Sequence, residues 1–331
     1  MSGDVALVEV WRGAMVESRH RGHAVICDDA GRIVASWGDP EVLIYPRSSA
    51  KMFQAVPLAE AVPDLAVARL ALACASHEGA PVHVGEVEGW LADLGFGEED
   101  LRCGKQPTRD ADLHIEQIRE GLPTTQIHNN CSGKHAGFLQ LGQSLGGGAE
   151  YLEIGDPVQR EVKAAFEDLT GAPSPHFAID GCSAPNHAAR LADFARGLAR
   201  FAAAGTGTGS RTAAQARLVE AMMARPDLVA GDGRACTELM QAAGGRAALK
   251  TGAEGVFAGI LPDLGLGVAL KISDGATRAA EAALAAILVG LGVLDADHPA
   301  TRRRLDAPVT NWRGIETGRI AVDPALAGWR L

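Results

Sequence analysis

Hydrophobic and polar residues alternate at the beginning of the chain. Three short runs within this region are rich in apolar and β-branched residues, which predicts β-strands: Ala6–Trp11, Ala24–Cys27 and Ile33–Ser36. The residues Asp28–Gly31, between the second and third runs, are typical of a hairpin turn. The pattern therefore predicts that the chain opens with paired strands.

Through the middle of the chain the apolar residues recur every three to four positions, as they do in amphipathic helices. Six segments between about residues 63 and 243 follow this spacing: Asp64–Cys74, Val82–Leu94, Gly133–Leu145, Pro157–Leu169, Ala188–Ala203 and Thr212–Ala224. Gly205–Ser210 alternates glycine with small polar residues, and we expect a flexible linker there. A phosphate-binding loop is excluded, because no strand leads into it and no Gly-Lys-Ser or Gly-Lys-Thr sequence follows.

Extended segments return in the last third of the chain. Ala247–Lys250, Gly255–Leu261 and Gly267–Ile272 predict strands, and the alanine-rich run Ala276–Leu294 predicts a helix. One largely antiparallel sheet flanked by helices accommodates this order most simply, which is an α/β (α+β) fold with a helical subdomain. We expect a single domain over residues 1–331, with the sheet from about 1–46 and 245–331 and the helical subregion at about 63–243.

The composition limits the classes of function. Hydrophobic residues make up 47% of the chain and charged residues 22%, which is typical of a folded globular protein. The net charge of −10 argues against a nucleic-acid partner, because binding to phosphates requires clustered Lys and Arg. The apolar run Ala282–Leu294 is too short to span a bilayer, and Met1–Gly13 lacks the apolar core of a signal peptide. We therefore expect no membrane partner and a cytoplasmic location.

The cysteines are widely spaced and form no Cys-X-X-Cys pair. In a cytoplasmic protein of this size we expect free buried thiols rather than a disulfide framework. Those with polar neighbours are candidates for metal binding. The six residues are Cys27, Cys74, Cys103, Cys131, Cys182 and Cys236.

Ser48 and Lys51 have the spacing of a serine nucleophile and its lysine base. Residues three positions apart share one face of a helix, with Cβ atoms roughly 5–6 Å apart, so a neutral lysine amine there can take the serine proton. Only six of the 31 basic residues are lysine, and a desolvated lysine can lose its proton whereas an arginine cannot. The alternative is a serine at an exposed helix start with a surface lysine.

Two further segments fit an active site of this kind. Lys250-Thr251-Gly252 lies in a predicted strand, and serine enzymes of the penicillin-recognising type combine Ser-X-X-Lys on a helix with Lys-Thr-Gly on a strand. Ser76-His77-Glu78-Gly79 follows a predicted helix, at the place in the chain where such enzymes carry a third motif. The alternative for Ser76 is a simple helix cap.

Two polar clusters could hold a metal ion. Asn129–His135 contains a thiol, a lysine and a histidine, and Asp180–Ser183 contains a carboxylate and a second thiol. From the ligand preferences of zinc alone we expect Cys131, His135 and Cys182, with Asp180 as a fourth candidate. A pair of buried free thiols is the alternative, and a Cys–His nucleophile is another.

Several of these segments together resemble the rhizobial-type L-asparaginase family, also called the asparaginase II family. The resemblance extends over roughly residues 7–323 and is most specific in Asn129–His135. The other segments that carry it are Pro46–Gln54, Ala75–Glu78, Cys103-Gly104, Asp180–Cys182 and Lys250–Gly255.

The resemblance implies a fold similar to that of serine β-lactamases and glutaminases, and hydrolysis of L-asparagine to L-aspartate and ammonia. It implies a catalytic centre with two serine–lysine pairs, Ser48 with Lys51 and Ser76 with Lys250. It also implies a homodimer and a zinc site.

For zinc, the resemblance implies the ligands Cys131, Lys134 and Cys182, so that Lys134 replaces His135 in the expected ligand set. A lysine ligand must be neutral, and the metal ion itself supplies the field that lowers its pKa. His135 and Asp180 are then candidates for contacts that support the ligands from outside or that bind the substrate, and Arg47 is a candidate for binding the substrate.

The combined hypothesis is an asparaginase in which Ser48, deprotonated by Lys51, attacks the side-chain amide of asparagine. Ser76 and Lys250 then pass a proton to the leaving ammonia. Three alternatives stay open: an amidohydrolase in which zinc activates water, a penicillin-interacting serine hydrolase, and a non-catalytic protein that binds amino acids.

Overall fold

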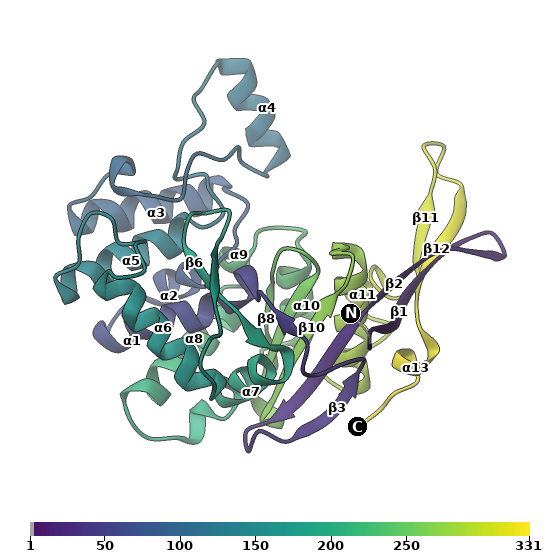
Figure 1. Cartoon of the computed structure of the whole chain (residues 1–331). Coiled ribbons are helices and arrows are strands. Elements are labelled where there is room, and N and C mark those ends of the chain that lie inside the picture. The colour runs from purple at the N-terminus through teal and green to yellow at the C-terminus, as the bar shows by residue number, and fades with distance from the viewer. Residues whose placement is uncertain (1–2) are drawn as a thin grey trace. The chain divides into compact units, whose positions relative to one another are not determined.

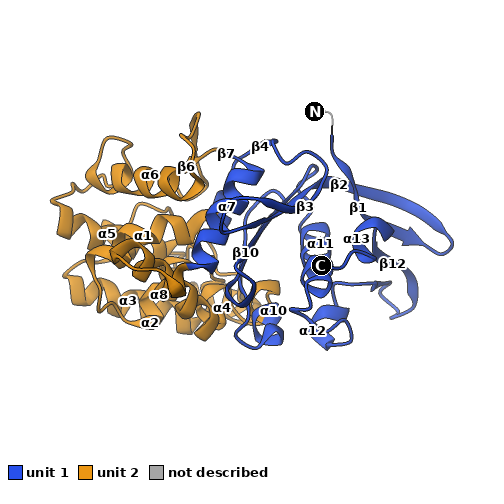
Figure 2. Ribbon diagram, turned by 90° about the horizontal axis from the view of Figure 1, so that it is seen from below, with its two compact units in different colours: residues 1–49, 189–203, 238–331 blue, residues 50–188, 204–237 orange. Residues whose placement is uncertain are grey.

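The computed structural model describes residues 3–331. The chain divides into two compact units, which Figure 2 distinguishes by colour. Of the described residues, unit 1 contains 3–49, 189–203 and 238–331, and unit 2 contains 50–188 and 204–237. Each unit is therefore assembled from segments that are far apart in the sequence, and the single domain expected from the sequence stays a prediction.

Unit 1 is built on one antiparallel sheet from both ends of the chain (Figure 1). Within the described residues the sheet has eight strands in the order β11-β12-β1-β2-β10-β9-β8, and β3 pairs with β2. This confirms the predicted α/β architecture. The strands are β1 Val5–Arg12, β2 Met15–Asp28, β3 Ile33–Trp37, β8 Ala248–Thr251, β9 Val256–Leu261, β10 Leu266–Ile272, β11 Ala307–Thr310 and β12 Glu316–Val322.

The centre of the sheet is apolar on both faces. The second half of β2 is buried from Gly22 to Cys27, and it lies between β10 and β3. At its end the chain reverses at the predicted hairpin turn, where Gly31 adopts a φ of 83° and its N–H donates to the Asp28 carbonyl at 3.0 Å. A residue with a side chain disfavours that backbone conformation, so the glycine fixes the turn.

Helices cover this sheet within unit 1. Helix α7 (Leu191–Ala202) packs on β2, β9 and β10, and α11 (Thr277–Gly290) packs on β1, β9, β10 and β12. The approach of α7 is so close that a Cβ at Gly267 of β10 would lie 2.3 Å from the Ala195 carbonyl oxygen. Helices α12 (Pro299–Arg302) and α13 (Pro324–Ala327) and the two-stranded pairing of β4 (Leu43–Ile44) with β7 (Ala189–Arg190) complete the unit.

Unit 2 is helical apart from one hairpin. Helix α1 lies at its centre and packs on α5, α6 and α8, and its residues from Lys51 to Ala59 are all buried. A helix that is buried on every side belongs in the interior of a bundle. The helices are α1 Lys51–Ala61, α2 Val67–Ala73, α3 Pro81–Leu94, α4 Ala111–Glu120, α5 Ser132–Leu145, α6 Pro157–Thr170, α8 Ser210–Ala224 and α9 Pro226–Val229, and the hairpin is β5 Phe177–Ile179 with β6 Pro185–His187.

Several predicted helices have other ends in the structure, and the one expected at Asp64–Cys74 begins only at Val67. The helix expected at Ala188–Ala203 begins only at Leu191, because residues 189–190 pair with β4. The helix expected at Ala276–Leu294 ends at Gly290. Helix α10 (Ala235–Ala243) lies near the end of the predicted helical subregion.

We searched residues 3–331 for a helix with both the length and the apolar character needed to cross a bilayer, and found none.

Candidate active site

The Ser48 segment is a 3-10 turn, η1 (Arg47–Ala50), that precedes α1. Ser49 is fully buried, and both its backbone N–H and its hydroxyl donate to the Pro46 carbonyl, at 3.2 and 2.6 Å. Ser48 is partly exposed. Of the two adjacent serines, Ser49 is thus used to hold the turn, and Ser48 is the better candidate for a nucleophile.

The Lys-Thr-Gly segment lies in unit 1 at the end of β8. Lys250 is fully buried, and its amine donates to the Thr251 carbonyl at 2.9 Å. A Cβ at Gly252 would lie 2.6 Å from the Pro46 carbonyl oxygen and 3.3 Å from the Ser49 nitrogen. The glycine is therefore required because the strand runs directly against the backbone of the Ser48 turn.

The other expected pair members, Lys51 and Ser76, lie together in unit 2. Lys51 is 1% exposed, and its amine donates to the Ser76 hydroxyl at 3.1 Å and to the Cys131 sulfur at 3.0 Å. It also donates to the Ala75 carbonyl and, at 3.4 Å, to the Asn130 carbonyl. The backbone N–H of Ser76 donates to the Val229 carbonyl at 2.9 Å. The lysine amine thus contacts both a hydroxyl and a thiol in the interior.

The segment Asn129–His135 forms the start of α5. The Asn129 side-chain oxygen accepts a hydrogen bond from the Cys131 N–H at 2.9 Å, and this bond fixes Cys131 at the N-terminal end of α5. A Cβ at Gly133 would lie 2.6 Å from the Leu72 carbonyl oxygen of α2. The glycine in this segment therefore allows α5 to approach α2.

Lys134 brings the second thiol into the same cluster. Its amine donates to the Cys182 sulfur at 3.0 Å. Cys182 lies in the turn between β5 and β6, where Ser183 has a φ of 68° and its N–H donates to the Asp180 carbonyl at 2.9 Å. We call Lys51, Ser76, Cys131, Lys134 and Cys182 the lysine–thiol cluster.

Charges within the lysine–thiol cluster shift its pKa values. Hydrogen bonding with Cys131 lowers the pKa of the Cys182 thiol well below its usual value, and the Lys134 charge adds to this effect against burial. The same hydrogen bond and burial raise the pKa of Cys131. Burial acts to lower the pKa of Lys134. The interactions of its amine with the two thiols and Asp180 are stronger, so the pKa is raised overall. The cluster therefore favours a thiolate at Cys182 beside a lysine ammonium.

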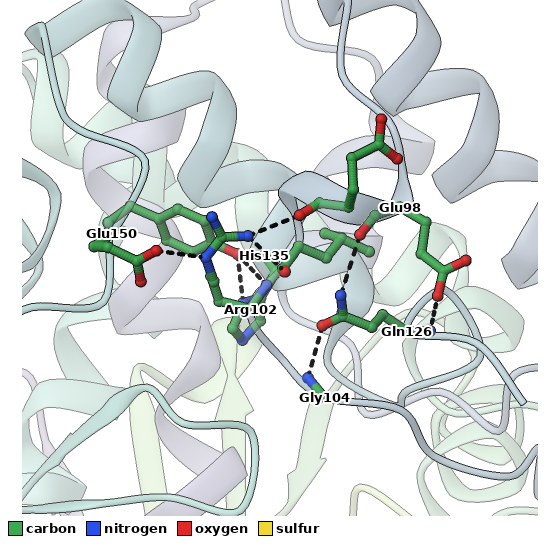
Figure 3. A network of polar contacts seen from close by, with 9 residues as sticks. Glu98, Arg102, Gly104, Gln126, His135 and Glu150 are labelled. Atoms are coloured by element: carbon green, nitrogen blue, oxygen red, sulfur yellow. Dashed lines mark hydrogen bonds and ion pairs between the residues drawn. The ribbon is translucent and has the colours of Figure 1, made fainter.

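His135 lies directly after this cluster and is fully buried. Its Nδ1 is 2.9 Å from the Tyr151 hydroxyl, and burial lowers its pKa to about 4, with Cys182 partly opposing that shift. Figure 3 shows His135 within a network of polar contacts that also contains Arg102 and Glu150. His135 is thus a neutral imidazole whose Nδ1 is fixed by the Tyr151 hydroxyl.

The donors of the lysine–thiol cluster fit a zinc ion. Thiolate sulfur and neutral nitrogen are the donors that zinc prefers, and two thiols and an amine converge here. No group of three or more His, Cys, Asp and Glu side chains able to hold a metal occurs within residues 3–331, so a three-ligand site here requires the Lys134 nitrogen. Zinc binding would release the proton from that lysine.

The remaining predicted residues are less enclosed. Asp180 is partly exposed in the β5–β6 turn, and its carboxylate accepts the Gly181 N–H at 2.7 Å. Arg47 belongs to unit 1 and has a φ of 55°, an uncommon conformation for a residue with a side chain. Sequence reasoning missed Tyr151, because no short motif contains it.

A buried lysine amine that contacts a serine hydroxyl and a thiol can take part in nucleophilic or acid–base catalysis. The model of the L-asparaginase II family matches residues 8–322. The chain belongs to the L-asparaginase II family, and the resemblance described above is confirmed.

Two solved structures resemble the chain at low sequence identity. A putative β-lactamase from Bacteroides dorei is 13% identical and aligns over 76% of this chain and 84% of its own, with a TM-score of 0.43. A β-lactamase from Mycobacterium bovis is 14% identical over 78% of this chain and 89% of its own, with a TM-score of 0.30. No curated protein matches the chain.

Proposed function

We propose that this protein is an L-asparaginase, which hydrolyses L-asparagine to L-aspartate and ammonia through a serine nucleophile activated by lysine. The observation that carries the proposal is the buried amine of Lys51, which is 3.1 Å from the Ser76 hydroxyl. Lys51 is also the first residue of α1, the helix that follows Ser48 in the chain. Membership of the L-asparaginase II family supports the same chemistry.

The first half of the proposed reaction forms an ester. The Ser48 oxygen attacks the side-chain carbonyl carbon of asparagine while its proton passes to Lys51. The carbon–nitrogen bond then breaks, and the nitrogen leaves as ammonia after it takes a proton through Ser76 and Lys250. The product of this half is an aspartyl ester on Ser48.

The second half releases aspartate. Lys250 regains its proton from water through Ser76, the hydroxide attacks the ester carbonyl, and Lys51 returns its proton to the Ser48 oxygen as the ester bond breaks. The serine and both lysines end in their starting states, so the reaction consumes only asparagine and water.

The lysine–thiol cluster would orient the substrate in this scheme. Cys131, Lys134 and Cys182 would hold zinc, which supplies a Lewis-acid site for a carboxylate or amine when bound. Asp180, with its negative charge, suits the α-ammonium group of an amino acid, and the Arg47 guanidinium suits a carboxylate. We infer that these residues select a free amino acid as the substrate.

Ammonia release from L-asparagine and L-glutamine tests the proposal. We expect Ser48→Ala to abolish ammonia release from asparagine and to leave the unfolding transition unchanged, because Ser48 is partly exposed. Ser144→Ala, an exposed serine on α5, is the matched control and should retain full activity. Near-normal activity of Ser48→Ala would refute the assignment of the nucleophile.

A chelator separates the proposal from a mechanism in which zinc activates water. If the metal only orients the substrate, its removal raises KM more than it lowers kcat. If the metal generates the nucleophile, its removal abolishes turnover, and Ser48→Ala stays active. That second pair of results would replace the serine mechanism.

We also propose that the protein is a cytoplasmic homodimer. The resemblance to the L-asparaginase II family supports the dimer. Light scattering on the purified protein would give twice the mass of the 331-residue chain, and a mass equal to one chain would refute the dimer.

A further inference from the structure

Tyr151 connects an external loop to the buried His135. Its ring is 1% exposed, and its hydroxyl is 2.9 Å from the backbone nitrogen of Arg102 and 2.9 Å from Nδ1 of His135. The tyrosine and histidine rings meet edge to face, with centroids 5.7 Å apart. The hydroxyl is therefore shared between one backbone amide and one imidazole nitrogen.

These two contacts determine where the protons lie. A backbone N–H can only donate, so the tyrosine oxygen accepts from Arg102. The tyrosine O–H then has His135 Nδ1 as its one acceptor among residues 3–331, and it must donate to that nitrogen. A neutral imidazole carries a single N–H, so the hydrogen-bond network assigns the proton of His135 to Nε2.

The loop that holds Tyr151 is fixed from several sides. The Arg102 guanidinium donates to the Glu150 carboxylate at 2.9 Å, as Figure 3 shows. It also donates to the Glu99 carbonyl at 2.8 Å. The fully buried Gln159 donates to the Tyr151 carbonyl at 2.9 Å. The Arg102 backbone N–H that donates to the Tyr151 hydroxyl and the backbone of Tyr151 itself are therefore both held in place by contacts that do not involve His135.

The proton-bearing Nε2 of His135 is buried and has no hydrogen-bond partner among the described residues. An unpaired buried donor is costly, so such an atom indicates an acceptor that completes the site. The Cys182 sulfur is the acceptor beside it: the amine of Lys134, the preceding residue on α5, contacts that sulfur at 3.0 Å, and His135 is among the groups whose interaction lowers the pKa of the Cys182 thiol. A thiolate accepts an N–H more strongly than a thiol does.

We propose that Tyr151 is a positioning residue that fixes His135 as an Nε2–H donor toward the Cys182 sulfur. This inference rests on the proposed role of Cys182 as a metal ligand. A ring nitrogen that carries a proton has no lone pair for a metal, so His135 supports the ligand set from outside and Lys134 supplies the nitrogen donor.

Nitrogen NMR of protein labelled at histidine tests the proton assignment without turnover. Long-range proton–nitrogen correlations distinguish the protonated ring nitrogen from the bare one. In the wild-type protein we expect the His135 proton on Nε2, and in Tyr151→Phe we expect a population with the proton on Nδ1. A wild-type proton on Nδ1, or identical spectra for the two proteins, would overturn the proposal.

Gln159→Met is the matched control for this measurement. It removes the hydrogen bond to the Tyr151 backbone and leaves the tyrosine hydroxyl and His135 in place. We expect its His135 spectrum to match that of the wild type. If Gln159→Met redistributes the proton as Tyr151→Phe does, the effect is a general loosening, and the positioning role is wrong.

Zinc affinity, measured by competition with a chelator, tests the contact with Cys182. Loss of an outer hydrogen bond to a ligand weakens metal binding by about 10–100-fold. We expect this loss in Tyr151→Phe and His135→Asn, whereas His135→Gln should stay near the wild type because its amide nitrogen reproduces the Nε2 donor. Equal loss in His135→Gln and His135→Asn would identify a direct ligand and overturn the proposal.

Two further outcomes also decide against it. Unchanged zinc affinity in His135→Asn with a raised KM for asparagine would mean that the donor serves a substrate carboxylate instead. A wild-type protein that binds no zinc would remove the metal ligand that His135 supports. Both results are distinct from a failure of the proposed function, which would appear as no ammonia release from a protein that binds zinc normally.

Discussion

Gly252→Ala probes the packing that places Ser48. The added Cβ would lie 2.6 Å from the Pro46 carbonyl oxygen, closer than real Cβ atoms come to such a group. That oxygen also accepts the N–H and the hydroxyl of Ser49, so its displacement weakens both hydrogen bonds of the turn. The substitution therefore acts on the turn through one atom.

The magnitude follows from these contacts. Overpacking a filled site costs about 1–3 kcal/mol, and two weakened hydrogen bonds add about 1–2 kcal/mol. We expect Gly252→Ala to lower the free energy of unfolding by about 2–5 kcal/mol. A catalytic group moved by roughly 1 Å can lose about 100-fold in rate, and we expect kcat for asparagine to fall by at least that factor.

Urea unfolding and ammonia release measure the two effects, and Gly89→Ala is the control. A Cβ added at Gly89, within α3, would meet no other group within 4 Å, so alanine there should stabilise the protein by about 0.5–1 kcal/mol through helix propensity alone. Wild-type stability and activity in Gly252→Ala would show that the strand does not press on the Ser48 turn.

Three other substitutions follow from buried groups. Burial lowers the pKa of His83, so the unfolded chain binds more protons and stability falls as the pH drops below about 6.5. His83→Gln can keep the donor to the Asp227 carbonyl without titrating, and its urea midpoint should fall less between pH 7 and pH 5; an equal fall would contradict this. Thr301→Val removes a buried hydroxyl that has no hydrogen-bond partner in the described chain. Calorimetry should show a stability equal to that of the wild type or up to about 1 kcal/mol higher, and a clear loss of stability would reveal a missed partner. Gly231→Ala forces a Cβ to 2.3 Å from the Glu78 side chain at a φ of 114°, so Tm should fall by several degrees, and an unchanged Tm would refute that contact.

Local patterns predicted the elements whose burial is regular. The strands at Ala6–Trp11 and Gly267–Ile272 and the helix at Pro157–Leu169 were found within one residue at most ends, because one or both of their faces meet the core. The hairpin β5–β6 has three-residue strands, and β11 and β12 contain Pro, Gly and charged residues. Such strands are stabilised mainly by pairing with residues that are distant in the sequence, so their own residues do not predict them.

The candidate site divides in the same way. The spacing of Ser48 and Lys51 indicated a reactive lysine, but its contacts with Ser76 and Cys131 join residues 25 and 80 positions apart. A periodic pattern of residues cannot predict contacts between residues so far apart in the sequence. The proposed role of Tyr151 depends on where a single proton lies, and only the surrounding hydrogen bonds reveal that.

The sheet of unit 1 places a constraint on synthesis of the chain. Strand β2 is buried from Gly22 to Cys27, yet its neighbour β10 follows about 240 residues later, where Cys27 pairs with Gly267. At about 5–20 residues per second, the ribosome would need roughly 10–50 s to deliver that partner. During this interval an apolar strand has an open edge in a crowded cell, so we expect the yield of folded protein to depend on chaperones that shield the N-terminal strands.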